Sequence, residues 1–516
     1  MLKTALQNGE FVITCEFVPG RGKDGAAINA PIEFAKTIAA SGLGVHAISL
    51  TDNPGGSPAI SPDVLAKEIK QAGVDVLVHF SCRDINRNAI EARAMALARS
   101  GITNILVVTG DYTKGGFEGT ASPVFDLDAV QATKYLKAMS AGLEVPGRKK
   151  GTTDKLPATD FCVAAAVSPF KLTEAEYLPQ LFKMEKKIAA GADFIITQLG
   201  YDMRKSFEVK RYMASRGLRT PLFGNVYVLS AGIAKAMRSG DVPGCVVSDE
   251  LMKVLEEEAK APDKGKRARL ERAAQMVAMF KGMGFNGVHI GGFALSAEDF
   301  RFIITHAAEV APRWQEFIPG LCFGRKDEYY AFPPPDKYQI TTPDADPVPG
   351  LKRGNKPVAF AFWDFMHSLA FQPGTAMYRM IRAYYRAIGD KGIVARCSHS
   401  MESVVKRIFF ECHDCGDCAL PELAYCCPMS KCAKQQRNGP CGGSTDGRCE
   451  VYPDEKPCVW TLVYERLKSV GRLDEMRTQY TPARKANLEY TSGWANFFLE
   501  RDHTGKNEPQ ATAGPH

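Results

Sequence analysis

Nine of the fifteen cysteines in the chain lie close together, between Cys412 and Cys458. Thiols at this density indicate metal binding, because disulfides are rare in a reducing compartment. The first three follow the spacing Cys412-x2-Cys415-x2-Cys418, which resembles the start of a ferredoxin-type run. Zinc sites more usually use separated cysteine pairs. The nine candidate ligands are Cys412, Cys415, Cys418, Cys426, Cys427, Cys432, Cys441, Cys449 and Cys458.

Nine thiols exceed the needs of one metal site. They suffice for two [4Fe–4S] clusters, or for one cluster and one zinc ion. Either group could serve a redox role, or could only stabilise the fold of its own domain. Both readings stay open from the sequence.

A second set of polar residues follows short apolar runs in the first three hundred residues. Two carboxylates, one histidine, one glutamine and one tyrosine stand at the ends of these runs, together with several small residues. Small residues allow a flat ligand to approach the backbone closely. The residues are Glu16, Thr51, His79, Thr109, Gly110, Asp111, Ala164, Ala166, Gln198, Asn225 and Tyr227. Histidines and aspartates are too few among them to predict a catalytic metal.

The apolar runs predict the fold that would bring these residues together. Eight strand-like runs alternate with helix-like stretches, and near-continuous apolar strands between helices indicate a parallel sheet that is buried on both faces. Eight units in about three hundred residues predict a TIM (β/α)8 barrel. A doubly wound sheet is the alternative, but no Gly-x-Gly-x-x-Gly turn follows the first run. The runs are 11–17, 46–51, 75–80, 103–110, 160–167, 193–198, 220–226 and 286–292.

The periodicity divides the chain into four parts. We expect the barrel over residues 1–315 and a Pro- and Asp-rich linker over 316–355. A smaller Cys-rich metal-binding domain follows over 356–500, and a disordered tail over 501–516.

Composition limits the class of protein. Hydrophobic residues make up 45% and charged residues 24% of the chain, as in soluble globular proteins. No apolar run is long enough to span a membrane, and the first residues lack the pattern of a secretory signal, so we expect a cytoplasmic protein. A formal charge of +7 without a compact arginine-rich stripe argues against nucleic-acid binding.

Several stretches of the first part resemble the methylenetetrahydrofolate reductase family. They are "CEFVPG", "LVHFSCRD", "NILVVTGDY", "KKIAAGADFIITQ" and "GVHIGG", between residue 1 and about residue 312. The resemblance implies a flavin-bearing TIM barrel that reduces 5,10-methylenetetrahydrofolate to 5-methyltetrahydrofolate, in a direction that the sequence leaves open. It implies FAD in preference to FMN.

The resemblance also assigns roles to individual residues. Glu16 matches the acid that protonates N10 of the folate, and Asp111 matches the carboxylate beside the flavin pyrimidine edge. Gln198 matches a folate-contacting glutamine. The family's aromatic after the seventh strand is displaced here, and Tyr227 is the candidate for its role, with Asn225 beside it. Positions that match flavin contacts are Thr51, His79, Thr109, Gly110, Asp111, Ala164, Ala166 and Lys187.

The cysteine-rich part resembles the C-terminal domain of the small metal-bearing partner of the acetogen-type reductase, here fused to the barrel. This implies electrons from a protein complex, passed through an iron–sulfur domain, as an alternative to NAD(P)H. Two other functions compete: a flavin-free methyltransferase barrel that binds methyltetrahydrofolate, and a non-catalytic scaffold with a structural zinc. We expect an oligomer.

Overall fold

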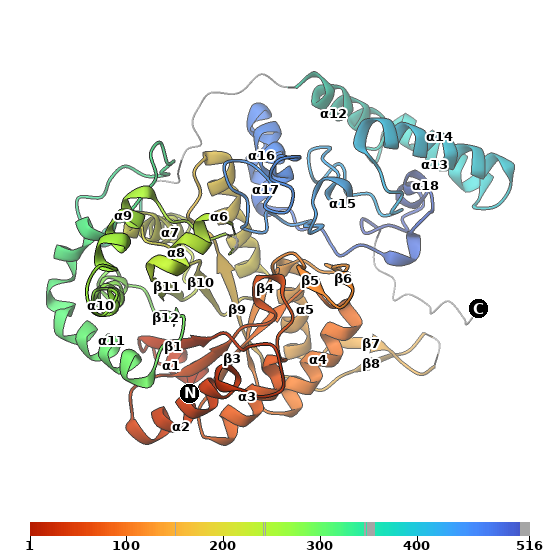
Figure 1. Cartoon of the computed structure of the whole chain (residues 1–516). Coiled ribbons are helices and arrows are strands. Elements are labelled where there is room, and N and C mark those ends of the chain that lie inside the picture. The colour runs from red at the N-terminus through yellow and green to blue at the C-terminus, as the bar shows by residue number, and fades with distance from the viewer. Residues whose placement is uncertain (150, 241, 243, 345–346, 348–356, 506–516) are drawn as a thin grey trace.

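The computed structural model describes the whole chain except residues 150, 241, 243, 345–346, 348–356 and 506–516. Eight parallel strands close into a barrel in the order β1-β12-β11-β10-β9-β4-β3-β2. Helices surround the barrel, and a helical, cysteine-rich region follows it (Figure 1). The predicted TIM barrel is therefore confirmed, and each predicted run overlaps one barrel strand, although β3 and β11 end one and two residues beyond their runs.

The barrel strands are short, as their sequence runs are. Their bounds are β1 Val12–Phe17, β2 Ala47–Leu50, β3 Val76–Ser81, β4 Asn104–Val108, β9 Cys162–Val167, β10 Phe194–Thr197, β11 Leu222–Val228 and β12 Gly287–Gly292. Two small antiparallel pairs lie outside the barrel, β5 Gly115–Gly116 with β6 Gly119–Thr120, and β7 Glu144–Pro146 with β8 Thr153–Lys155.

Side chains alternate along each strand between the barrel interior and the helix layer. Along β1, Val12 packs in the interior apolar cluster, and Glu16 lies further along on the same side. Helix α1 (Leu2–Gln7) adds Leu2 to this cluster, so apolar side chains fill the N-terminal end. The polar positions are therefore left at the C-terminal end, where barrel enzymes carry their sites.

The outer helices follow their strands in the usual βα order. They are α2 Ala26–Ser41, η1 Pro54–Gly56, α3 Pro62–Gln71, α4 Arg87–Arg99, α5 Ala129–Ala141, α6 Glu174–Ala189, α7 Met203–Ser215, α8 Ala231–Arg238, α9 Asp249–Glu258, α10 Lys266–Gly282, α11 Ala297–Val310 and η2 Ala311–Leu321. Two of them begin with a capping box, which satisfies free N–H groups at the helix start: Asp128 with Gln131 for α5, and Ser296 with Asp299 for α11.

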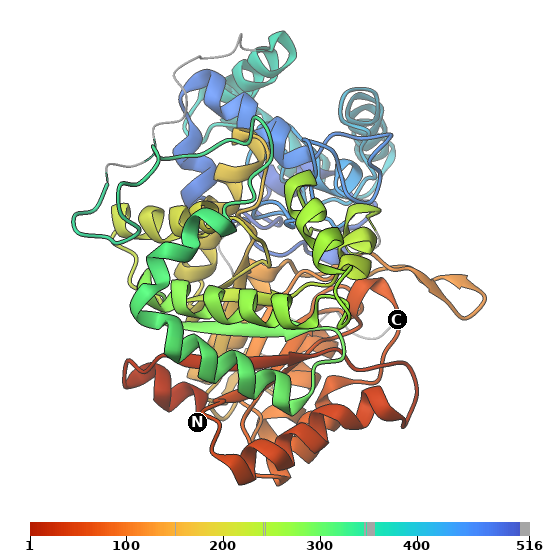
Figure 2. The ribbon, with the colours of Figure 1, turned by 60° about the vertical axis from the view of Figure 1, so that its left-hand side comes forward.

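The cysteine-rich region lies over one end of the barrel, and Figure 2 shows the same stacking after a turn. Its helices are α12 Val358–Ala370, α13 Ala376–Ile388, α14 Ile393–Phe410, α15 Pro428–Lys431, α16 Val459–Val470, α17 Leu473–Thr478, η3 Ala486–Leu488 and α18 Gly493–Phe498. Helices α16 and α17 pack on α6 of the barrel.

Buried hydrogen bonds join this region to the barrel. Lys183 of α6 donates to Gln436 Oε1, Gly439 O and Pro440 O, at 2.9, 3.0 and 3.1 Å. Asp128 caps α5 with one carboxylate oxygen and accepts from Arg437 N and Asn438 Nδ2 with the other. The two regions therefore share polar groups that water cannot reach.

The predicted linker and tail both have described parts that pack on other segments. Glu208 of α7 accepts the backbone N–H groups of Ala331 and Phe332, which fixes part of the 316–355 segment on the barrel. Residues 501–505, expected to begin a disordered tail, include the buried Asp502 and His503, and His503 bonds to Asp417. The rest of the predicted tail, 506–516, lies outside the described residues.

None of the described helices is both long enough and apolar enough to cross a membrane.

Asp128 both caps α5 and bonds to the cysteine-rich region, so its substitution should destabilise the protein more than the loss of a helix cap alone. Asp128→Ala removes the cap of α5 and leaves the buried donors of Arg437 and Asn438 unpaired, so the free energy of unfolding should fall by about 2–4 kcal/mol. Ser296→Ala removes the matching cap of α11 and should cost about 1 kcal/mol. Urea denaturation of both variants measures the difference. Equal costs would show that Asp128 does not hold the two regions together.

Candidate active site

A cavity of about 270 Å³ opens at the C-terminal end of the barrel. Ten of the predicted site residues line it: Glu16, Thr51, His79, Thr109, Gly110, Asp111, Ala166, Lys187, Gln198 and Asn225. Residues of the cysteine-rich region line it as well, among them Lys434, Cys441 and Glu450. The cavity is therefore built by both parts of the chain.

Glu16 is held by a chain of hydrogen bonds across two strands. His289 Nε2 lies 3.0 Å from Glu16 Oε2, and the hydroxyl of Thr14 lies 2.8 Å from Nδ1 of the same ring. His79 Nε2 lies 3.6 Å from Glu16 Oε2 and 2.9 Å from Ser49 Oγ. A carboxylate oxygen of Glu16 and one ring nitrogen each of His79 and His289 all lie within 4.8 Å of one another. The sequence did not indicate so close a cluster.

The histidines lower the pKa of Glu16. Burial raises the pKa of this carboxyl. The hydrogen bond and charge of His289, with a further contribution from His79, together lower the pKa by more, and the net pKa lies below the ordinary value. Burial lowers the pKa of His79 itself to about 4.

Two polar atoms on the cavity wall are buried without a hydrogen bond in the described part of the chain: Thr51 Oγ1 and Gln180 Nε2. Buried polar groups are rarely left unpaired in native proteins, and an unpaired group costs about 1–3 kcal/mol. Both residues line the cavity.

The β4 end forms a close-fitting corner of the cavity. Gly110 has φ of +89°, and a Cβ at this position would lie 2.3 Å from Ser81 Oγ, so only glycine fits. Asp111 follows, and its Oδ2 accepts the backbone N–H of Gly55 at 2.9 Å. The acceptor Asp111 and the bare backbone of Gly110 thus lie side by side.

Lys187 reaches the same cavity from α6. Its Nζ donates to Ala166 O at 2.5 Å, and burial, with the nearby Lys183, lowers its pKa to about 7. Gln198 directly follows β10. Its side-chain Oε1 accepts the backbone N–H of Leu199, so the amide bonds to the adjoining backbone.

Two predicted residues lie elsewhere. Ala164 is in the interior apolar cluster, one inward-facing position before Ala166 on β9. Tyr227 does not line the cavity, and its ring lies beside Gly291 of β12. Burial raises the pKa of Tyr227 to about 12, so it is a neutral phenol.

The cysteine-rich region contributes an ion pair to the cavity. Lys434 pairs with Glu450, and its Nζ also donates to Gly110 O at 2.8 Å. The thiol of Cys441 lies 3.4 Å from Glu450 Oε1. Thr109 Oγ1 lies 3.4 Å from Gln436 Oε1, so contacts from this region reach two of the predicted flavin positions.

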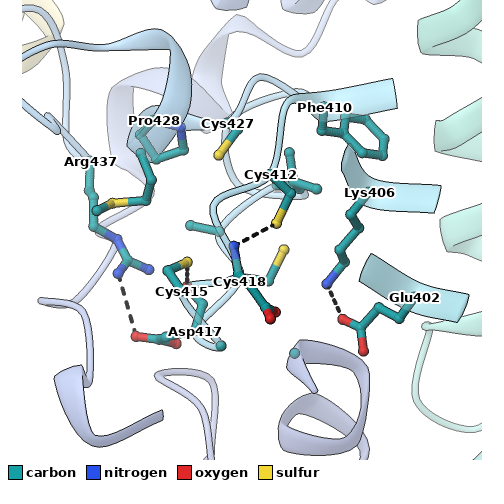
Figure 3. A pocket seen from close by; sticks show the side chains of 16 residues that line it. Glu402, Lys406, Phe410, Cys412, Cys415, Asp417, Cys418, Cys427, Pro428 and Arg437 are labelled. Atoms are coloured by element: carbon teal, nitrogen blue, oxygen red, sulfur yellow. Dashed lines mark hydrogen bonds and ion pairs between the residues drawn. The ribbon is translucent and has the colours of Figure 1, made fainter. Parts of the chain in front are cut away.

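The predicted cysteine ligands fall into several environments. Cys412, Cys415, Cys418 and Cys427 line one pocket inside the cysteine-rich region (Figure 3). Cys441 lines the barrel cavity instead. The others are Cys426 and the half-buried Cys432, Cys449 and Cys458.

Sequence reasoning missed His289, Lys434 and Glu450. His289 could have been found by alternation, because Gly287 and Gly291 flank it at inward-facing positions of the eighth strand. Lys434 and Glu450 carried no such pattern, because they stand in an irregular segment more than three hundred residues from β4.

Comparison with known families identifies the barrel. The family model described as "Methylenetetrahydrofolate reductase" matches residues 1–308, more than half of the chain. The chain belongs to the methylenetetrahydrofolate reductase family. A second family model, "Methylene-tetrahydrofolate reductase C terminal", matches residues 393–487, which include all nine clustered cysteines. The family resemblance inferred from sequence is thus confirmed.

Individual relatives are distant. The chain is 23% identical over 235 residues to "Methylenetetrahydrofolate reductase (NADH) 1" of Arabidopsis thaliana, over 44% of this chain and 37% of that one. It is 27% identical over 231 residues to "Methylenetetrahydrofolate reductase 2" of Schizosaccharomyces pombe, over 42% and 32%. The matches span about a third of these relatives' length.

Among solved structures, an uncharacterised Clostridium thermocellum protein that binds two copies of 5-methyl-5,6,7,8-tetrahydrofolic acid aligns with 60% of this chain and 99% of its own, at 14% identity and a TM-score of 0.42.

The ion pair at the cavity predicts a large difference between two lysines. Lys434→Met leaves Glu450 buried without its cation, which should lower the free energy of unfolding by about 3–5 kcal/mol. Lys431, on the same region, pairs with the exposed Glu411 at 2.7 Å, and Lys431→Met should cost less than about 1 kcal/mol. Chemical denaturation measures both, and a small cost for both would contradict the burial of the Lys434–Glu450 pair.

Proposed function

We propose that the chain is a flavin-dependent reductase that converts 5,10-methylenetetrahydrofolate to 5-methyltetrahydrofolate. The observation that carries this proposal is the hydrogen-bonded chain of Thr14, His289 and Glu16. It places on the cavity an acid that is bonded to a histidine, and residues that line the same cavity have unpaired polar atoms. The family supports folate as the substrate class.

The cavity fits a flavin by its chemistry. Thr51 Oγ1 and Gln180 Nε2 offer unpaired groups, and Gly110 and Ala166 leave the backbone open to a flat ring. Thr109, Asp111, Lys187 and His79 complete the wall that would hold it. When bound, the flavin supplies hydride transfer to the methylene carbon of the substrate. We take it as FAD, and mass spectrometry of the released cofactor separates FAD from FMN.

Glu16 and His289 have to supply one proton and stabilise one positive charge. Protonation of folate N10 opens the five-membered ring and leaves a cationic iminium at N5. Because the pKa of Glu16 is lowered, its carboxylate is ionised near neutral pH and stabilises that cation. The proton then comes from the Glu16–His289 pair as a unit, across their 3.0 Å contact. Gln198 and Asn225 lie on the cavity wall as candidate folate contacts.

The cysteine-rich region suggests how electrons enter. Its thiols suit an iron–sulfur centre, with zinc as the alternative, and such a centre would pass electrons singly to the flavin. Cys441 lines the cavity that holds Glu16 and Asp111, which supports a short path between the two. The donor would be a one-electron protein, with NAD(P)H as the alternative. The same site could run in reverse and oxidise 5-methyltetrahydrofolate.

Replacement of the acid tests the proposed reaction. Glu16→Gln keeps the size of the side chain but removes the charge and the proton, so folate reduction should fall by about 10²–10⁴-fold. The flavin absorbance should remain, because the wall positions are unchanged. A steady-state assay with the spectrum of the variant measures both. A colourless wild-type protein would instead favour a methyltransferase barrel, and full activity of the variant would favour a scaffold.

The contact between Glu16 and His289 predicts a change in the pH dependence of activity. In His289→Gln, Glu16 alone carries the proton, so the pH at which activity declines on the alkaline side should move down towards the range of a carboxylic acid. Thr14→Val removes the bond to Nδ1 and the bond to Val288 O but keeps the His289–Glu16 contact, so its profile should move less. The pH profiles of kcat/KM measure this, and an unmoved profile in His289→Gln would exclude His289 from the proton path.

A further inference from the structure

The nine cysteines separate into two groups of four and one remaining thiol. We infer that Cys412, Cys415, Cys418 and Cys427 hold one [4Fe–4S] cluster, that Cys432, Cys441, Cys449 and Cys458 hold a second, and that Cys426 holds neither. This assignment deepens the proposed entry of electrons, but it rests on the thiols alone and does not depend on the reaction in the barrel.

The first group surrounds a single pocket. Figure 3 shows the sulfurs of all four residues directed into it, from one loop and from the start of α15. The backbone N–H of Asp414 points at Cys412 Sγ, 3.3 Å away. Such N–H groups stabilise the sulfurs of a bound cluster, because they bond to thiolate charge.

The second group is brought together by a short hairpin and a turn. Cys449 N bonds to Lys456 O and Cys458 N to Gly447 O, around the antiparallel bridge of Arg448 with Pro457. In this register Cys449 and Cys458 are diagonal neighbours on one face of the hairpin. Glu450, next to Cys449, contacts the thiol of Cys441, which joins that thiol to the hairpin.

Cys432 completes the second group through the turn that follows it. The backbone N–H groups of Lys434 and Gln436 point at the sulfur of Cys432. Lys183 holds Gly439 and Pro440 of the same turn directly before Cys441.

The spacing of the sulfurs is wider than the spacing around one zinc ion. Four Zn–S bonds of about 2.3 Å in a tetrahedron place the sulfurs about 3.8 Å apart. Yet in the described part of the chain, which contains all nine cysteines, no three of these sulfurs lie within 4.8 Å of one another. A four-iron cluster binds each thiolate through a different iron, so its sulfurs are necessarily further apart than around one ion.

Buried lysines lie beside each of the two groups of cysteines. Lys406 lies against the first pocket beside Cys418 and Cys412, and Lys171 and Lys183 lie beside Cys441. A cluster with four thiolates carries net negative charge, so lysines that are costly to bury alone become favourable next to it. Lys406 and Arg437 both line the first pocket, and each is paired with a carboxylate there, Lys406 with Glu402 and Arg437 with Asp417.

Cys426 belongs to the apolar core instead. Its side chain is 1% exposed, and it does not line the pocket that its neighbour Cys427 lines. Cys426→Ala is therefore a matched control for removal of a buried thiol from the same loop.

Metal analysis of the full chain, purified without oxygen, tests the assignment without any assay of activity. We expect about eight irons and eight sulfides per chain and no stoichiometric zinc. Cys415→Ala and Cys441→Ala should each lose about half of the iron, and the double variant nearly all of it. Cys426→Ala should keep the wild-type content. Electron paramagnetic resonance after dithionite reduction should lose a different signal in each single variant.

The wild-type count decides the point even if a variant fails to fold. One zinc per chain in place of iron, or only about four irons, would overturn the two-cluster assignment. Loss of iron in Cys426→Ala equal to that in Cys415→Ala would overturn the grouping. Circular dichroism of each variant distinguishes loss of a cluster from loss of the fold. None of these results depends on folate reduction, so the proposed reaction could fail while the assignment stands.

Discussion

The structure depends on a few buried lysines that bind the backbone of the cysteine-rich region to the barrel. Lys183 donates to three acceptors, the full number for an ammonium group, and Lys171 donates to Gly442 O and Ser444 O at 2.5 and 2.6 Å. Burial lowers the pKa of both lysines, so these bonds have to offset the cost of desolvation. Without them the segment that carries Lys434, Cys441 and Glu450 would not reach the barrel cavity.

This contact makes the candidate active site and the proposed metal sites parts of one structure. The barrel supplies Glu16, its histidines and the open wall around Gly110, and the cysteine-rich region supplies an ion pair and a thiol on the same cavity. Charge links the two as well, because the lysines that fix the backbone also lie beside the second group of thiols.

Sequence patterns predicted the barrel and most of its site because both depend on local periodicity. Eight apolar runs gave the strands, and the residue at each run's end gave Glu16, His79 and Asp111. Contacts between distant segments left no such pattern. Lys183 resembles any charged residue of an amphipathic helix, and its partners lie about 250 residues later. The contact of His289 with Glu16 left no pattern for the same reason, because the two residues lie 273 positions apart in the sequence.

A single turnover tests the central claim, that the cavity beside the cysteine-rich region is a flavin site for folate reduction. The full chain is reduced without oxygen and without excess donor, then mixed with 5,10-methylenetetrahydrofolate while the flavin absorbance is followed. The account predicts that oxidised flavin returns and that one 5-methyltetrahydrofolate forms per flavin. A protein without flavin absorbance, or a reduced flavin that methylenetetrahydrofolate leaves unchanged, would contradict it.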